Sequence, residues 1–220
     1  MKHITNKIKN SVKKGIAGLA LAGSLAFPSQ TSAQMNGALE VLSGEKTTLT
    51  DTKLSLDLGK KVNVFGRNIT SFDYESGKKN PFSLVDVSYN LSNGLGGVFE
   101  TQFVKGMAPD PRLGLQFFKK KDDLSFYSIG TININGEPNF EGVAKLRYTP
   151  RINDKFNGLF QLENLANFNG EGLNFAVQRA RVGLVRGNYE FGVGANITEV
   201  NSKGKIKNDY MLGGFLGFKF

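Results

Sequence analysis

The sequence has no cysteine and no tryptophan, and its only histidine is His3. A chain without cysteine forms no disulfide and offers no thiol nucleophile, so packing and backbone hydrogen bonds alone must stabilise it. No imidazole follows His3, which excludes hydrolytic mechanisms with a histidine base and the common zinc sites built from histidine and cysteine. The sequence therefore predicts neither an acyl hydrolase nor a zinc protein.

Carboxylates are the catalytic groups that remain, because glycoside hydrolysis needs only a pair of them. Four glutamates in alternating segments are more simply explained as polar lining: Glu100, Glu141, Glu163 and Glu190. The acidic residues of the predicted loops lack the spacing of a calcium-binding EF-hand: Asp73, Glu75, Asp110 and Glu171. We therefore predict a protein that is not an enzyme and that needs no cofactor or metal ion.

Residues 1–33 have the order of a secretory signal peptide. Five lysines between Lys2 and Lys14 precede the apolar run 16–27, and Pro28 and the small residues 31–33 follow it. The run has about a dozen residues, whereas a membrane-spanning helix needs about 20. We predict that residues 1–33 are a cleaved signal peptide and that residues 34–220 form the mature domain. An N-terminal anchor or a soluble helix is the alternative.

The positive charge of the chain is concentrated in this leader. The net charge is +9, and removal of the five leader lysines lowers it to +4. A nucleic-acid-binding domain gathers lysine and arginine on one face. Here the remaining basic residues are scattered along the chain, so we predict no nucleic-acid partner.

After Gln34 the sequence has no run of 18 apolar residues, which excludes a membrane-spanning helix. Apolar and polar residues instead alternate, most clearly over 54–58, 85–91, 140–148 and 189–197. This period of two is typical of β-strands. Turn signals such as Asn93-Gly94 recur about 14 to 18 residues apart, farther than the 8–12 residues typical of soluble β-sandwiches. The spacing favours strands long enough to cross a membrane.

We predict twelve strands, with ten as the alternative because the first two are the least regular. Their approximate ranges are 37–43, 48–58, 62–72, 83–91, 95–104, 112–119, 124–134, 139–149, 155–165, 173–185, 189–200 and 209–220. In the strand 173–185, Phe175 and Val177 share the phase of Arg179 and Arg181, and a β-bulge near Gln178 would separate the two pairs.

An even number of strands places both chain ends on one side of the sheet. We expect longer loops on the other side, at 44–47, 73–82, 105–111, 135–138, 166–172 and 201–208. Tight turns are expected beside the chain ends, at 59–61, 92–94, 120–123, 150–154 and 186–188. Such asymmetry is typical of bacterial membrane barrels.

The last strand alternates apolar residues up to Phe220, and one face carries Tyr210, Leu212, Leu216, Phe218 and Phe220. This pattern resembles the C-terminal insertion signal of Gram-negative outer-membrane β-barrel proteins. The resemblance covers residues 34–220 in general and 210–220 most specifically. It implies an all-β fold, a transmembrane antiparallel up-and-down β-barrel of about twelve strands. It also implies a location in the bacterial outer membrane, with lipid and the barrel assembly machinery as partners.

In a barrel, the alternation assigns one set of charged residues to the lumen: Arg67, Glu100, Lys145, Arg147, Glu163, Arg179, Arg181 and Glu190. Adjacent strands would place Glu163 between two basic pairs, Lys145 with Arg147 and Arg179 with Arg181. These four cations against one anion predict a constriction that favours anions. Alternatively, the same charges form a salt-bridged plug that fills the lumen.

These features predict a monomeric outer-membrane barrel that acts as a narrow, porin-like channel for small solutes, anions in particular. One alternative is a closed barrel with a structural or surface-binding role. Another is a soluble periplasmic carrier similar to lipocalins.

Overall fold

The computed structural model describes residues 34–202 and 205–220, and the predicted signal peptide lies outside these ranges. The chain forms twelve strands, which excludes the ten-strand alternative. They are β1 (Gln34–Gly44), β2 (Thr47–Leu58), β3 (Val62–Asp73), β4 (Lys79–Asn90), β5 (Leu95–Val104), β6 (Asp110–Lys121), β7 (Leu124–Asn133), β8 (Phe140–Tyr148), β9 (Asn157–Asn169), β10 (Gly172–Arg186), β11 (Tyr189–Ser202) and β12 (Lys205–Lys219). In the described ranges no helix has the length and apolar character needed to cross a bilayer.

The strands form a closed ring in which each one pairs antiparallel with its neighbours in the chain. β1 and β12 close the ring, with Leu39 opposite Phe218 and Leu42 opposite Phe215. Closure leaves no strand edge with unpaired backbone groups, which is the condition for a sheet to exist in hydrocarbon. The predicted antiparallel up-and-down barrel is confirmed.

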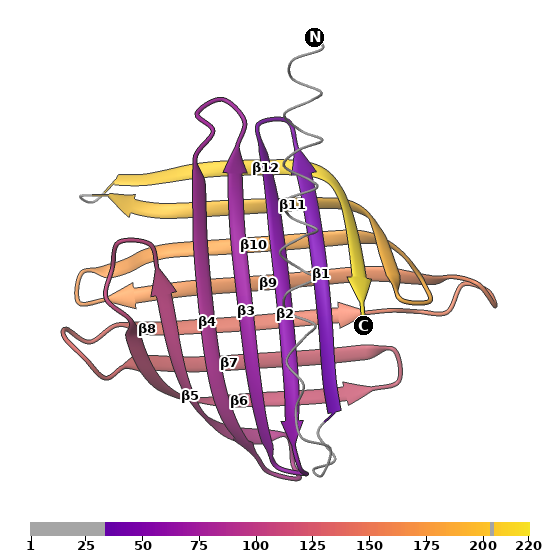
Figure 1. Cartoon of the computed structure of the whole chain (residues 1–220), viewed down its shortest axis with the longest axis horizontal. Helices are drawn as coiled ribbons and strands as arrows, with labels where there is room; N and C mark the ends of the chain where they lie inside the picture. Colours follow the sequence, from indigo (N-terminus) through magenta and orange to yellow (C-terminus); the bar gives the residue numbers. More distant parts are fainter. Residues whose placement is uncertain (1–33, 203–204) are drawn as a thin grey trace, which may run out of the picture. The chain divides into compact units, whose positions relative to one another are not determined.

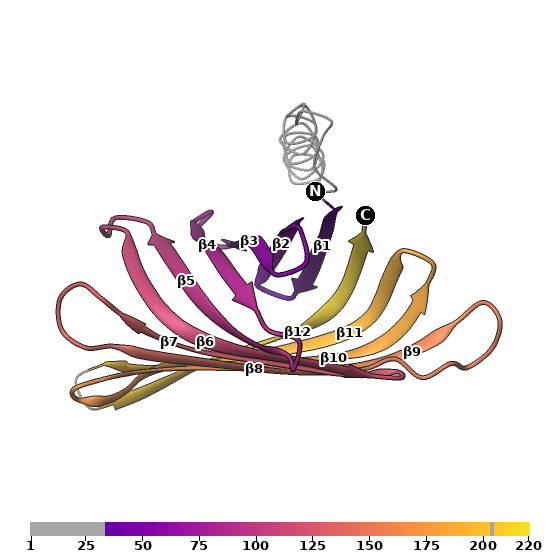
Figure 2. The ribbon, with the colours of Figure 1, turned by 90° about the horizontal axis from the view of Figure 1, so that it is seen from below.

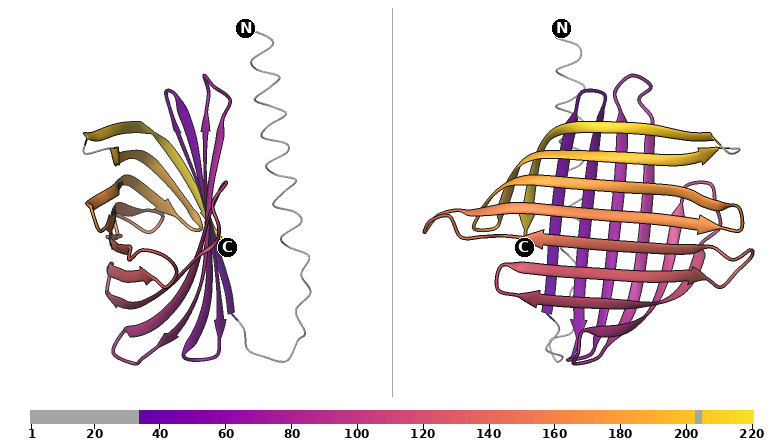
Figure 3. Two further views of the ribbon diagram at one scale, coloured as in Figure 1. Left: turned by 90° about the vertical axis from the view of Figure 1, so that its left-hand side faces the viewer. Right: turned by 180° about the vertical axis from the view of Figure 1, so that it is seen from behind.

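The strands of opposite walls cross each other. β1 to β4 form one wall, and they run at a steep angle to β8 to β11 on the other side (Figures 1 and 3). Figure 2 shows the curved wall of β5 to β12 facing β1 to β4. Closing a sheet into a barrel requires such tilted strands. As a result, inward side chains of β3 and β9, which lie opposite each other in the ring, can meet across the lumen.

The connections do not show the predicted difference in length between the two ends. We call the end with Gln34 and Phe220 the terminal end; its connections are 59–61, 91–94, 122–123, 149–156 and 187–188. The distal end has the connections 45–46, 74–78, 105–109, 134–139 and 170–171, and also joins β11 to β12. The prediction is wrong because strand pairing continues into the expected loops. Leu173 pairs with Phe168, and Asn201 pairs with Ile206.

The predicted bulge near Gln178 is also wrong. The register between β9 and β10 is unbroken from Phe175 to Val185, and the irregularity lies between Leu173 and Phe175. Val177 pairs with Leu165, which lines the lumen. The inner face of the barrel therefore includes apolar positions, and Val177 needs no bulge to be accommodated.

Two paired glycines bring the backbones of β10 and β11 close together. A Cβ atom on Gly183 would lie 2.1 Å from the carbonyl oxygen of Phe191, and one on Gly192 would lie 2.2 Å from that of Val182. Gly192 is also opposite Phe215 of β12. The Phe215 side chain is buried in an apolar cluster with Leu42 and Leu159.

Elsewhere the distribution of polarity is the reverse of that in a soluble protein. Arg112 and Arg181 are only 1% and 2% exposed, whereas Leu115 and Leu212 are 71% and 74% exposed. Charged residues are almost never fully buried unless they are paired, and a wide apolar surface is unfavourable in water. The outer surface is therefore suited to lipid and the interior to polar contacts.

Candidate lumenal site

An arginine bridges the two walls of the barrel. Arg67 of β3 donates two hydrogen bonds to Asp51 on the adjacent strand β2, at 2.9 and 2.7 Å. The same guanidinium also donates from Nη2 to Glu163 Oε1 at 2.9 Å. Because β3 and β9 lie opposite each other in the ring, this contact spans the lumen. Arg67 is 11% exposed, so the bridge is largely shielded from solvent.

Glu163 is the acceptor at which several basic residues converge. It is in register with Lys145 on one side and with Arg179 on the other, as the sequence places them. Arg179 donates a hydrogen bond to it. Lys53 forms an ion pair with Asp51 at 2.7 Å. We call the four cations around these two carboxylates the basic cluster: Lys53, Arg67, Lys145 and Arg179.

Two features of the basic cluster are unusual. Lys145 has no hydrogen-bond or ion-pair partner within the described part of the chain. The Nε atom of Arg179 is buried and likewise has no hydrogen-bond partner among the described residues. The cluster therefore has two more positive charges than Asp51 and Glu163 neutralise.

The other predicted basic residues are paired elsewhere, so the expected excess of three cations around Glu163 is wrong. Arg147 pairs with Glu190 of β11 at 2.6 Å. Arg181 pairs with Glu40 of β1 at 2.7 Å. The two glutamates come from strands that are not adjacent to these arginines, and only the curvature of the barrel brings them within reach.

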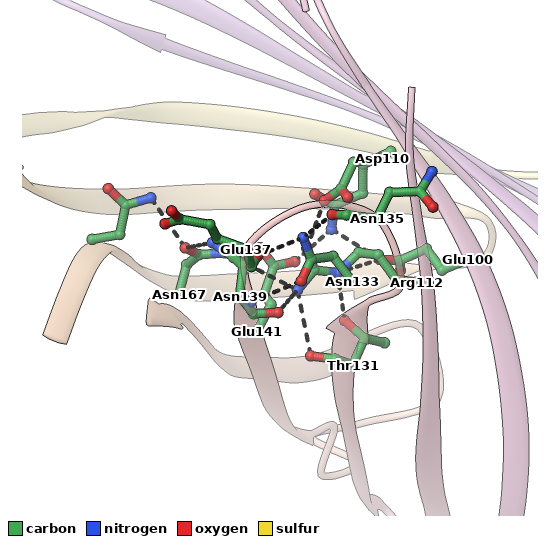
Figure 4. Close-up of polar contacts among 12 residues, drawn as sticks. Glu100, Asp110, Arg112, Thr131, Asn133, Asn135, Glu137, Asn139, Glu141 and Asn167 are labelled. Carbon is green, nitrogen blue, oxygen red and sulfur yellow. Dashed lines mark hydrogen bonds and ion pairs between the residues drawn. The ribbon is translucent and has the colours of Figure 1, made fainter. Parts of the chain in front are cut away.

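A second polar network lies toward the distal end (Figure 4). The Arg112 guanidinium donates to Asp110 Oδ2 at 2.7 Å, to Thr131 Oγ1 at 2.9 Å and to the carbonyl oxygen of Asn139 at 3.0 Å. Asn139 and Asn167 join their amides by two hydrogen bonds of 2.9 and 2.8 Å. The network links β6 to β9 and satisfies buried polar groups that would otherwise destabilise the barrel.

Acidic residues gather on a different part of the inner wall. Asp86 and Glu100 are neighbours in the β4–β5 register. The Gln102 amide donates to both Glu100 and Glu141, at 2.8 Å each. Among the residues that the structure describes, no group of acidic or histidine side chains could hold a metal ion.

A cavity of about 1190 Å³ lies between the basic cluster and the acidic residues. Its lining extends to residues 91–94 at the terminal end and includes no described residue of the distal connections. Part of the lining is apolar: Phe65, Ile69, Phe82, Leu84, Leu91, Phe118, Ile129, Val143 and Leu165. The cavity is thus both charged and apolar, and it extends from the terminal end into the barrel.

Sequence reasoning missed several inward residues: Glu40, Asp51, Lys53, Asp86 and Arg112. The alternation of Lys53 with Leu54 and Leu56 was a usable signal. Glu40 lies in one of the least regular strands, where alternation does not identify the inner face.

The residues predicted to form the insertion signal lie on the outer surface, all of them at least 37% exposed: Tyr210, Leu212, Leu216, Phe218 and Phe220. The Phe218 ring contacts Tyr189 at 5.1 Å and stacks on Phe220 at 6.0 Å between ring centroids. The Gly37 amide donates to the Phe220 carbonyl at 2.7 Å, beside the seam between β12 and β1.

The closed ring, the apolar outer surface and the polar interior define a transmembrane β-barrel. No family model and no curated protein matches the sequence. Among solved structures, the chain is similar to the outer-membrane expressed OmpT of Vibrio cholerae, with 7% identity and a TM-score of 0.38 over 89% of this chain and 99% of that one. It is also similar to the translocator domain of the autotransporter NalP from Neisseria meningitidis, with 10% identity and a TM-score of 0.34 over 98% and 97% of the two chains. No family assignment follows from similarity at this level.

Proposed function

We propose that this protein is a monomeric outer-membrane β-barrel whose lumen is closed to free diffusion. The observation that carries the proposal is the contact between Arg67 and Glu163, which joins opposite walls. Arg181, paired with Glu40, and the cluster of Leu42, Leu159 and Phe215 fill the region beside β10 to β12. A closed barrel of this kind has a structural or binding role and no enzymatic one. Lipid and the barrel assembly machinery are its partners.

Conductance across a planar bilayer tests the closure. We expect the purified wild-type protein to give no steady channel. Arg67→Ala should introduce conducting steps because it removes the bridge but leaves Glu163 with Arg179 and Asp51 with Lys53. Arg151→Ala is the matched control, since Arg151 is exposed and pairs with Asp154 outside the lumen. A wild-type conductance as large as that of Arg67→Ala would refute the closed barrel.

A narrow, porin-like pore for small anions is the second candidate. The cavity and the excess positive charge of the basic cluster favour it, since fixed cations in a confined passage attract anions. The same recordings distinguish the two candidates. A steady wild-type current with anion preference would support the pore.

Export to the outer membrane is tested separately. The order of residues 1–33 supports cleavage before Gln34. We expect mass spectrometry of the outer-membrane fraction to find a chain that begins near Gln34. Recovery of the chain with Met1 intact from the cytosol would contradict export.

A further inference from the structure

The basic cluster requires a negative partner that the described residues do not supply. Lys53, Arg67, Lys145 and Arg179 share only two carboxylates. A charge inside a protein is costly unless it is paired or hydrogen-bonded. Lys145 lines the cavity without a hydrogen bond or ion pair to any described residue, and Arg179 Nε is buried without a hydrogen bond to one. The cavity is therefore prepared for an anionic group beside these two side chains.

Three apolar residues of the lining, one each on β3, β8 and β9, lie on the distal side of this charge, whereas Phe65 and Phe118 lie toward the terminal end. β3 and β9 run from the terminal end to the distal end, so Ile69 follows Arg67 and Leu165 follows Glu163 in that direction. β8 runs the opposite way, which places Val143 distal to Lys145. A barrel lumen is usually polar. Apolar side chains from three strands at this end of the cavity therefore favour the binding of an apolar group there.

We propose that the cavity binds a single-chain anionic amphiphile, with its carboxylate at Lys145 and Arg179 and its aliphatic chain against Ile69, Val143 and Leu165. The ligand enters from the terminal end, because the cavity reaches residues 91–94 there. The volume of about 1190 Å³ is sufficient for a ligand of this size. Binding requires the folded barrel but does not depend on whether the barrel conducts ions, so it goes beyond the closed lumen proposed above.

Equilibrium binding to the full barrel in zwitterionic lipid nanodiscs tests this site, with empty nanodiscs as the blank. The probes are octanoate, acetate, which has the charge without the chain, and octan-1-ol, which has the chain without the charge. We expect saturable octanoate binding at least about tenfold tighter than that of either other probe. Equal binding of acetate or of octan-1-ol would overturn the proposal, as would the absence of saturable octanoate binding.

Two variants locate the headgroup and the chain. Lys145→Gln should weaken octanoate binding at least about tenfold, because it removes a charge-assisted contact. Leu165→Asn should weaken octanoate binding but leave acetate binding unchanged. Lys155→Gln, at an exposed position of the 149–156 connection, is the control for the loss of one positive charge.

The unfolding midpoint measured without ligand tests whether the Lys145→Gln barrel is folded. Since Lys145 makes no hydrogen bond or ion pair with a described residue and lies among three other cations, its removal should leave the unfolding midpoint unchanged or raise it. A stably folded Lys145→Gln barrel that binds octanoate as tightly as the wild type would overturn the site.

Discussion

Arg67 Nη2 lies 2.9 Å from Glu163 Oε1, although the two residues belong to opposite walls of the barrel. Glu163 also accepts a hydrogen bond from Arg179, and Arg67 also donates to Asp51. The lumen is therefore held together at this level by a chain of charged groups that extends from β2 to β10.

Glu163→Gln should destabilise the barrel by about 3–5 kcal/mol, the cost of removing one partner of a buried ion pair. Among the described residues, the change leaves Asp51 as the only carboxylate that pairs with the basic cluster. Urea unfolding in lipid vesicles measures the effect. Asp154→Asn, which breaks an exposed ion pair with Arg151, should change stability little. Equal stability of the two variants would show that the cross-lumen pair contributes nothing.

Gly192→Ala should destabilise the barrel by about 1–3 kcal/mol, as overpacking does in a protein core. The new Cβ atom would lie 2.2 Å from the carbonyl oxygen of Val182 and 2.5 Å from the Cα atom of Gly183, so the backbone has to move. Gly97→Ala is the matched control, because its Cβ atom would meet nothing within 4 Å. The midpoint of urea unfolding should be lower for Gly192→Ala than for Gly97→Ala. If the two variants are equally stable, the close approach of β10 and β11 is not needed for stability.

Replacing both Phe218 and Phe220 with Ala should reduce the amount of folded barrel in the outer membrane. Both rings lie beside the seam between β12 and β1, where Phe218 packs on Tyr189 and Phe220. Heat-modifiable migration of the outer-membrane fraction measures the folded amount. The control replaces Phe99 and Phe103, two lipid-facing rings of β5 that are 45% and 43% exposed. If both double variants accumulate equally, the terminal aromatic residues have no special role in insertion.

Leu115→Arg distinguishes a lipid environment from water. Leu115 is 71% exposed in the middle of β6. An arginine at the bilayer midplane costs about 2–4 kcal/mol, and the cost falls to about 0–1 kcal/mol near the interface. Leu124→Arg, at the terminal end of β7, should therefore be milder. In a soluble protein both changes would alter the unfolding free energy little. Unfolding in lipid vesicles measures this free energy, and a result in which neither change has an effect would contradict the membrane barrel.

Local sequence determined the strands and most of their inner and outer faces. The alternation of Glu141, Lys145 and Arg147 with Phe140, Ala144 and Leu146 depends only on the backbone of one strand, whose side chains point to opposite faces in turn. Pairing of neighbouring strands then followed from chain order, so Glu163 was correctly placed between Lys145 and Arg179. The positions where strands end at the distal connections could not be predicted from the sequence. Turn-forming residues do not show how far backbone pairing continues along β11 and β12.

The tertiary structure alone decided which charges meet across strands that are not neighbours. Arg67 reaches Glu163, and Arg181 reaches Glu40, across strands that are not neighbours. These contacts depend on the number of strands, their tilt and their stagger around the ring, quantities that no single strand encodes. The partners of Arg67, Arg147 and Arg181 are therefore a property of the closed barrel. The inward direction of each side chain is a property of its own strand.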